Sequence, residues 1–318
     1  MLKPVISIII VSFNTEKITF DCIKSVLADK GLSFELQRID LSGKTPAELI
    51  VVDNYSRDNS LKEIAKFPFI KIIKNKSNLG FGKANNQGIN KALGNYLLFL
   101  NSDTVILHSA ISQALNWLSS HPEASACTAQ LLNSDQTIQA SGGFFPNLLN
   151  VFTWSTGLDD LPLINKLILP LHPHTPQFYT HDDFYKKDHP QDWITGAFML
   201  LRKSALTENP GFDENYFMYG EELEWLYRIK KSHPTTQTWY LVGPQIIHLG
   251  GASATNKADP VINEYLGIMS FFKKHKSDLQ FRTVRLLLKT NCSLRRIIYS
   301  IFGEKTKSSI YTQACSKI

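Results

Sequence analysis

The stretch Val5-Ile-Ser-Ile-Ile-Ile-Val-Ser-Phe-Asn14 decides the fold of this chain, which has 318 residues. It is a run of β-branched residues interrupted by a serine, and its length is typical of a buried strand, so a strand is predicted over Val5–Phe13. The apolar residues that follow recur at helical spacing, namely Ile18, Cys22, Ile23, Val26 and Leu27. A buried strand that leads directly into a helix is the building unit of a parallel α/β sheet.

The same alternation of strand and helix continues as far as Asn101. Further strands are predicted over Ala47–Asp53, Ile70–Lys74 and Tyr96–Asn101, and helices over Asp58–Ala65 and Gly82–Leu93. The segment 31–44 lengthens the first crossover, and its sequence fits a hairpin and a loop equally well. Alternation of this kind predicts an α/β fold with a mostly parallel, Rossmann-like sheet and helices on both faces.

The second half of the chain is less regular. Residues 133–189 are rich in Pro, His and aromatic residues, so they are predicted to be mostly loop. Strands are then predicted over Asp192–Leu201 and Thr238–His248, and helices over Gly220–Lys231, Asp259–Lys274 and Phe281–Phe302. We expect a catalytic region over 1–270, with halves at 1–132 and 133–270, followed by a helical tail at 271–318.

The net charge of +6 is concentrated in that tail. Residues 271–318 carry eleven Lys and Arg against two acids, whereas residues 1–270 carry 23 bases and 26 acids. A slightly acidic body argues against nucleic-acid binding, and the basic tail predicts contact with an anionic surface.

The predicted helix at 281–302 has apolar residues at helical spacing with arginines and lysines between them. Such a basic amphipathic helix fits two arrangements equally, one in a membrane interface and one packed on the body with its charges in solvent. The apolar runs are well short of the roughly 20 residues that cross a bilayer, and the N-terminus lacks a cleavage signal. The four cysteines lack metal-ligand spacing and are expected to be free thiols. We therefore expect a cytoplasmic protein, peripheral on the inner membrane face if the tail binds lipid.

Polar residues end the predicted strands at Ser12-Phe13-Asn14, Asp53-Asn54 and Asn101-Ser102-Asp103. Ligands of an open parallel sheet bind outside the carboxyl ends of its strands. A single aspartate there is usually a turn or helix-capping residue, but two carboxylates at one edge repel unless a cation or donor compensates. We therefore expect Asp103 to hold a divalent cation that bridges phosphates, and Asp53 to accept hydrogen bonds from a base or ribose.

A loop with two glycines, Asn78-Leu-Gly-Phe-Gly-Lys83, precedes the predicted helix at Gly82–Leu93. Its backbone amides and the positive end of the helix could face a phosphate. A tight turn between strand and helix explains the same two glycines, and the sequence supports the two readings equally.

Glu221 and Glu222 stand in the first turn of a predicted helix, where the helix dipole favours acids, so solvated charge is the simpler reading. The segment in front of them, from Phe212 to Tyr219, is rich in aromatic residues. Partial desolvation raises the proton affinity of a carboxylate, which suits a general base. His248 ends the next strand before a Gly-Gly pair; a lone histidine there is usually structural, but the glycines make it a credible contact to metal or phosphate.

In this order, these motifs resemble the family 2 glycosyltransferases, especially the rhamnosyltransferase-like members. The resemblance covers roughly residues 5–255, and the ordered set is far more specific than any single motif. It rests on Ser7–Asn14, Val51–Ser60, Asn78–Gly82, Leu100–Thr104, Asp192–Ala197, Phe212–Glu214, Tyr219–Glu222 and His248–Ser253.

The resemblance implies a GT-A fold, inversion at the anomeric carbon and a divalent cation, Mg²⁺ or Mn²⁺. It assigns the metal to Asp103 and His248, catalysis to Glu222 with Glu221 as the alternative, and the acceptor pocket to Trp193 and Gly196. Contacts to the nucleotide sugar would come from Ser12, Asn14, Asp53, Asn78, Gly80, Lys83, Asn101 and Ser102. Two departures from the family pattern are Asn101, which replaces the first acid of a D-x-D motif, and Glu222, where the family usually has Asp.

The implied reaction is transfer of one sugar from a nucleotide diphosphate, with dTDP-rhamnose as one candidate donor. The acceptor would be a saccharide or a lipid-linked acceptor in cell-envelope polysaccharide synthesis. Addition of a single sugar is expected because the Q-x-x-R-W signature of processive enzymes is missing, and Trp-Leu-Tyr-Arg228 stands in its place. The alternatives are a nucleotidyltransferase, which normally has a Gly-rich basic loop after the first strand, and a non-catalytic nucleotide-sugar-binding protein.

Overall fold

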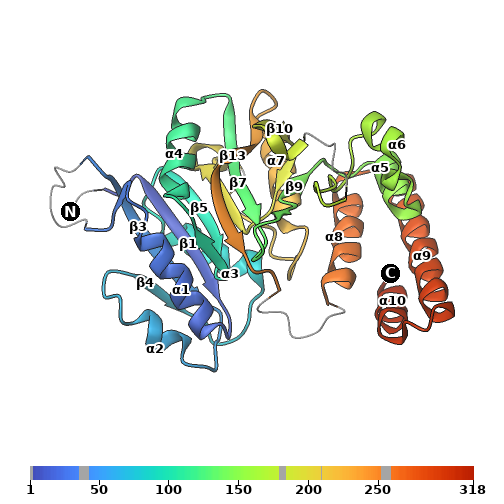
Figure 1. Cartoon of the computed structure of the whole chain (residues 1–318), viewed down its shortest axis with the longest axis horizontal. Coiled ribbons are helices and arrows are strands. Elements are labelled where there is room, and N and C mark those ends of the chain that lie inside the picture. The colour runs from blue at the N-terminus through green and yellow to red at the C-terminus, as the bar shows by residue number, and fades with distance from the viewer. Residues whose placement is uncertain (1–2, 36–42, 179–183, 209, 252–258) are drawn as a thin grey trace.

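The computed structural model describes residues 3–35, 43–178, 184–208, 210–251 and 259–318. Its first half is the predicted parallel sheet with intervening helices (Figure 1). β1 pairs in parallel with β3 and β5, and β4 pairs in parallel with β3. The strands are β1 (Ile6–Ser12), β3 (Thr45–Asp53), β4 (Lys71–Lys74) and β5 (Tyr96–Asn101), and the helices are α1 (Glu16–Leu27), α2 (Ser60–Ile64) and α3 (Phe81–Lys91).

The second half makes the sheet mixed. β12 (Phe198–Arg202) lies antiparallel between β5 and β7 (Ala124–Leu132), and β13 (Gln237–His248) pairs in parallel with β7. The remaining strands of this sheet are short: β2 (Leu32–Ser33), β6 (Thr104–Ile106), β8 (Ile138–Gln139) and β10 (His189–Gln191).

One prediction for the second half was wrong. The single strand predicted over Asp192–Leu201 is divided: β11 (Trp193–Ile194) pairs with β9 (Gly142–Gly143) in a separate small sheet, and β12 joins the main one. Residues 133–189 are rich in loops and turns, as predicted, but they also contain α5 (Leu148–Thr156), α6 (Pro162–Leu167) and the 3-10 turns η1 (Leu158–Asp160) and η2 (Phe184–Lys186). Asn147 starts α5 with a capping box, and Gly157 ends it with φ 73°, so the helix signals were present in the sequence.

Helices cover both faces of the sheet, as predicted. The alternation of side chains along β1 shows this directly, since Ile8 and Ile10 pack with α1 and with α4 (Ala110–Ser120), while Ile9 packs with α3 and with α7 (Glu221–Ser232). Buried strands that contact helices on both sides need apolar residues at nearly every position, which explains the unbroken isoleucine run.

The C-terminal helices form a bundle at one end of the molecule (Figure 1). α8 (Asp259–His275), α9 (Asp278–Ile301) and α10 (Lys305–Lys317) pack together with α5. Val284, Leu288 and Cys292 of α9 are completely buried there, so the predicted tail helix packs on the body through one face. The expected boundary near residue 270 falls inside α8. Among the described helices, none combines the length and apolar character needed to cross a bilayer.

Gly88 provides a test of how closely α3 approaches the sheet. A Cβ at this position would lie 2.5 Å from Cγ2 of Ile9, inside van der Waals contact with a buried β1 side chain. We expect Gly88→Ala to lower the free energy of unfolding by about 1–3 kcal/mol, measured by urea denaturation. Gly243→Ala is the matched control, because a Cβ there would lie 4.0 Å from its nearest neighbour, Oε1 of Gln113. Equal midpoints for the two variants would contradict the close packing of α3 on β1.

Candidate active site

The carboxyl ends of the central strands meet at one edge of the sheet. Ser12 lies opposite Asp53 in the β1–β3 pair, and Val11 lies opposite Asn101 in the β1–β5 pair. A polar cleft of about 390 Å³ opens at this edge. Eight of the predicted site residues line it: Asn78, Gly80, Asn101, Ser102, Asp103, Glu221, Glu222 and His248. The structure therefore brings together side chains from both halves of the chain.

Asp53 is buried at the end of β3, next to Asn54, which lines the cleft. Oδ2 of Asp53 accepts a hydrogen bond from the Ser56 amide at 3.3 Å. Oδ1 is also buried, and the described residues give it no hydrogen-bond partner. Because buried carboxylate oxygens are nearly always hydrogen-bonded in proteins, this oxygen suits an N–H or O–H donor of a ligand.

Asp103 and His248 form the candidate cation site. Oδ1 of Asp103 lies 3.3 Å from Nε2 of His248, a spacing that fits two ligands of one divalent cation. Nδ1 of His248 lies 2.5 Å from Oε1 of Gln139, and the Gln139 amide nitrogen donates to Oδ1 of Asn133 at 2.9 Å. If Nδ1 donates to Gln139, the Nε2 lone pair lies between Oδ1 of Asp103 and the Asn101 amide nitrogen, which is 3.3 Å away.

Glu221 and Glu222 are the first two residues of α7, and so lie in the first turn of a helix as predicted. Burial raises the pKa of both, and the charge of Glu222 raises the pKa of Glu221 further, well above its ordinary value. Oε1 of Glu222 accepts a hydrogen bond from the Gly196 amide at 2.9 Å, whereas the described residues offer Oε2 of Glu221 no partner. Hydrogen bonds from the Gly196 amide and from its own backbone offset part of the effect of burial on Glu222, so the pKa of Glu221 is raised more strongly than that of Glu222.

A second, apolar cavity of about 360 Å³ adjoins the polar cleft. Thr195, Tyr219 and Glu222 line both, so Glu222 lies at the junction between them. The walls of the apolar cavity include Trp193, Leu171 and residues of α8 such as Phe271. The buried Nε1–H of Trp193 has no hydrogen-bond acceptor among the described residues, so this wall also offers a donor.

Gly196 has a clear structural reason to be glycine. A Cβ there would lie 2.7 Å from the Phe81 ring and 3.0 Å from Oε1 of Glu222. Any larger residue would therefore displace the carboxylate from the amide that holds it. Gly196 positions Glu222 and does not itself line the apolar cavity.

The structure does not bring the other predicted residues to the cleft. Ser12 is completely buried, with its hydroxyl 2.9 Å from that of Thr19, and Lys83 forms an exposed ion pair with Glu214 at 3.2 Å. The side chain of Asn14 accepts a hydrogen bond from the Arg57 amide at 2.8 Å. These three side chains shape the surrounding loops rather than the wall of the cleft.

The two-glycine loop serves packing rather than presenting free amides. The Gly80 amide donates to Asn78, and the Phe81 amide donates to the carbonyl of Phe217 at 3.0 Å. Gly80 has φ 84°, and a Cβ on it would lie within 2.4 Å of that same carbonyl oxygen. Of the two readings of this loop, the tight turn is therefore the one that the structure supports.

Sequence reasoning missed Asn54 and Gln139 as organising residues. Asn54 accepts hydrogen bonds from the Leu79 amide and from Asn75, both at 3.0 Å, and so holds the 75–80 loop against β3. Its position directly after Asp53 was a usable signal. Gln139 belongs to a strand of two residues, for which the sequence gives no periodic signal. The Ala252–Ser253 part of the predicted histidine motif lies outside the described residues.

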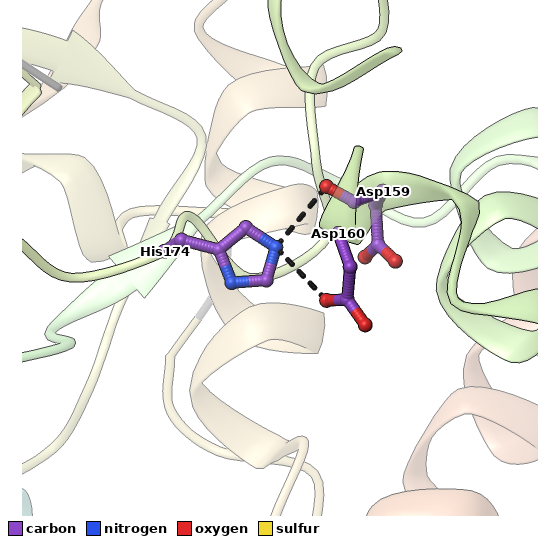
Figure 2. A group of neighbouring side chains, drawn as sticks. All are labelled: Asp159, Asp160 and His174. Atoms are coloured by element: carbon purple, nitrogen blue, oxygen red, sulfur yellow. Dashed lines mark hydrogen bonds and ion pairs between the residues drawn. The ribbon is translucent and has the colours of Figure 1, made fainter. Parts of the chain in front are cut away.

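Another group of potential metal ligands lies apart from this cleft. Asp159, Asp160 and His174 line a separate cavity of about 310 Å³ (Figure 2). Nε2 of His174 donates to the backbone carbonyl of Asp159 at 3.2 Å and lies 3.4 Å from Oδ1 of Asp160. These contacts tie the loop after Leu171 to η1, and so support a wall of the apolar cavity.

Residues 7–207 match the family model described as Glycosyl transferase family 2. The chain belongs to glycosyl transferase family 2. This match covers more than half of the chain and confirms the family that the ordered motifs indicated. The match ends at residue 207, just after β12, so α7, α8, α9 and α10 lie beyond it.

The similar relatives of this family 2 chain include rhamnosyltransferases. It is 24% identical over 211 residues to N-acetylglucosaminyl-diphospho-decaprenol L-rhamnosyltransferase of Mycobacterium tuberculosis, a match that covers 62% of this chain and 65% of the relative. It is 28% identical over 158 residues to rhamnosyltransferase WbbL of Escherichia coli, covering 47% of this chain and 54% of the relative. The chain thus spans less than two thirds of the length of each of these relatives.

Solved structures of glycosyltransferases show the same fold. GalNAc-T7 with UDP, GalNAc and Mn²⁺ has a TM-score of 0.56 at 15% identity, covering 85% of this chain and 48% of that protein. Mannosyltransferase PcManGT from Pyrobaculum calidifontis, in complex with GDP-Man and Mn²⁺, has a TM-score of 0.53 at 10% identity. The match covers 99% of this chain and 74% of that protein. The expected GT-A fold is therefore confirmed.

The contact between Gln139 and His248 gives a test of the candidate cation site. We expect Gln139→Leu to weaken Mn²⁺ binding by about 10–100-fold, because the ring loses the acceptor that fixes its tautomer. Mn²⁺ titration followed by electron paramagnetic resonance, with a nucleoside diphosphate present, measures this. Gln177→Leu is the control, since Gln177 donates to the Ile138 carbonyl beside Gln139 and is exposed. Equal affinities in both variants would remove His248 from the cation site.

Proposed function

We propose that this chain transfers a single sugar of the rhamnose class from a nucleotide diphosphate to a hydroxyl group of a saccharide or lipid-linked acceptor. The transfer inverts the anomeric carbon, depends on Mg²⁺ or Mn²⁺, and serves the synthesis of a cell-envelope polysaccharide. Among the alternatives, the family match disfavours a nucleotidyltransferase. A non-catalytic binding protein is disfavoured by two ionisable groups placed where transfer needs them, Asp103 and Glu222.

The position of Glu222 is the observation that carries the proposal. It is shared by a polar cleft, which contains Asp103 and His248, and an apolar cavity with few polar groups. A donor diphosphate suits the first space and an acceptor suits the second. A base at their junction can reach the acceptor hydroxyl as that oxygen attacks the sugar from the side opposite the leaving group.

In the proposed reaction, the acceptor oxygen forms a bond to the anomeric carbon while the bond from that carbon to the diphosphate oxygen breaks. Glu222 takes the proton of the acceptor hydroxyl, and the nucleoside diphosphate leaves with the electron pair. Asp103 and His248 would hold the divalent cation, which neutralises charge that develops on the diphosphate. The raised pKa of Glu221 favours its neutral form, which limits the negative charge beside the departing group.

The assignment of donor and acceptor draws on the relatives. The named activity of the mycobacterial relative includes rhamnose and a decaprenol-linked acceptor, and that of the Escherichia coli relative includes rhamnose. The apolar cavity beside Glu222 is compatible with an acceptor that carries a lipid portion. Addition of one sugar is expected because Trp225-Leu-Tyr-Arg228, within α7, stands in place of the signature of processive enzymes.

The two adjacent glutamates allow a matched pair of variants. We expect Glu222→Gln to lower kcat by at least about 10³-fold while leaving donor binding nearly unchanged, because amide and carboxylate are similar in size but only the carboxylate accepts a proton. Glu221→Gln should retain most of the activity, because Glu222, and not Glu221, lines the apolar cavity as well as the polar cleft. Release of nucleoside diphosphate is measured with Mn²⁺, a nucleotide-rhamnose donor and a lipid-linked acceptor. Near-normal turnover of Glu222→Gln would exclude it as the base.

The pH dependence of kcat gives an independent check. Burial raises the pKa of Glu222, and a base must be deprotonated to act, so activity should fall as the pH drops through that raised value. The acid limb should therefore lie above the pKa of about 4.3 of an exposed glutamate. Glu221→Gln should leave the limb in place. Activity that stays constant down to that value would contradict a desolvated base.

A further inference from the structure

The C-terminal bundle leaves an unusual number of large apolar side chains exposed. Among the described residues, seven exposed large apolar side chains lie in 149–169 and seven in 279–302, two thirds of all those exposed. The most exposed include Leu163 and Leu167 on α6, and Ile301 and Phe302 at the end of α9, with 69–78% of their surface accessible. Patches of this size on a folded protein usually mark an interaction surface.

These two segments belong to one end of the molecule. α5 and α9 pack against each other, and the buried Asn291 side chain donates to the Ser155 carbonyl. Figure 1 shows α5, α6 and α9 together at the end of the molecule far from β1. The exposed apolar side chains of both segments therefore lie at the same end of the molecule, and we name them together the apolar end surface.

α9 has three distinct faces. Val284, Leu288 and Cys292 are completely buried in the bundle. Leu286, Ile297 and Ile301 lie on the opposite side of the helix. Successive residues turn by about 100°, so Ile297, 11 residues after Leu286, and Ile301, 4 residues further on, recur on nearly the same side. All three are exposed, with accessible fractions of 48–76%. A helix that is apolar on both its packed face and its outer face needs a second apolar environment.

A basic row runs along one edge of the outer face. Arg282, Lys289 and Arg296 are seven residues apart, lie about 60° from the Leu286 row, and are exposed. Acids are rare here, since residues 271–318 carry two against eleven Lys and Arg. Apolar side chains bordered by cations match an anionic lipid surface. The apolar side chains would enter the acyl region, and the cations would contact the anionic headgroups.

We infer that the apolar end surface docks on an anionic lipid bilayer, with α9 lying in the interface. The inner side of the same bundle reaches the acceptor: Ile268 and Phe271 of α8 belong to the bundle core and also line the apolar cavity next to Glu222. Docking would thus bring the cavity beside lipid-linked molecules in the bilayer. This deepens the proposed function, because it names the surface through which a lipid-linked acceptor arrives.

Flotation of the full chain with phosphatidylcholine vesicles, with and without phosphatidylglycerol, tests the inference. We expect binding to the anionic vesicles only. Arg282→Gln/Lys289→Gln/Arg296→Gln should weaken it about tenfold at low salt, and Leu286→Gln/Ile301→Gln should weaken it about tenfold as well. Matched controls on the body, Lys30→Gln/Lys62→Gln/Lys91→Gln and Leu93→Gln, change exposed residues in the same way and should bind normally.

Absence of binding to anionic vesicles, or equal losses in the body controls, would overturn the inference. Self-association that is lost in Leu286→Gln/Ile301→Gln, without vesicle binding, would instead identify the surface as a contact between two copies of the chain. Metal-dependent release of nucleoside diphosphate with a soluble acceptor is measured on the same variants. Vesicle binding needs no catalysis, so failure of the docking surface and failure of the proposed activity are separate results.

Discussion

The antiparallel pairing of β12 with β5 is the constraint on which the site depends. Phe198 lies opposite Leu100, and the Asn101 amide donates to the Ala197 carbonyl at 3.2 Å, so β12 begins where β5 ends. A strand that enters the sheet in this direction places the turn before it beside the end of β5. That turn contains Gly196, whose amide holds Glu222. One strand pairing therefore joins the two halves of the chain at the cleft.

Three acidic side chains line the cleft and a fourth, Asp53, is buried next to it, and each has a different local environment. Asp103 lies against His248, and Glu222 accepts a backbone hydrogen bond. Burial and the charge of Glu222 raise the pKa of Glu221, which favours its neutral form. Asp53 keeps a buried oxygen to which the described residues donate no hydrogen bond, a pattern typical of a group that awaits a ligand. Negative charge is thus distributed by local environment rather than by residue type.

The sequence predicted the fold well as far as β5, because each buried strand and each helix there has its own periodicity, whereas α4 and β7 were not predicted. β5 was predicted with its observed bounds, and α7 and β13 within one or two residues. Pairing between distant strands leaves no periodic trace, so the division of Asp192–Leu201 between two sheets could not be anticipated. The same holds for Gln139, which reaches His248 only through tertiary contact. Lys83 was assigned from its motif, but Glu214, far along the chain, holds it away from the cleft.

The apolar lining around Glu222 has a consequence for fidelity. A transferase with a bound donor risks losing the sugar to water, since water can be deprotonated by the same base that activates an acceptor. The walls next to Glu222, which include Leu223, Val261 and Phe271, offer few partners to hold a water molecule in an attacking position. An alcohol attached to a bulky apolar group displaces weakly held water and fills that space. Such a lining would protect the activated sugar from wasteful hydrolysis until the correct acceptor arrives.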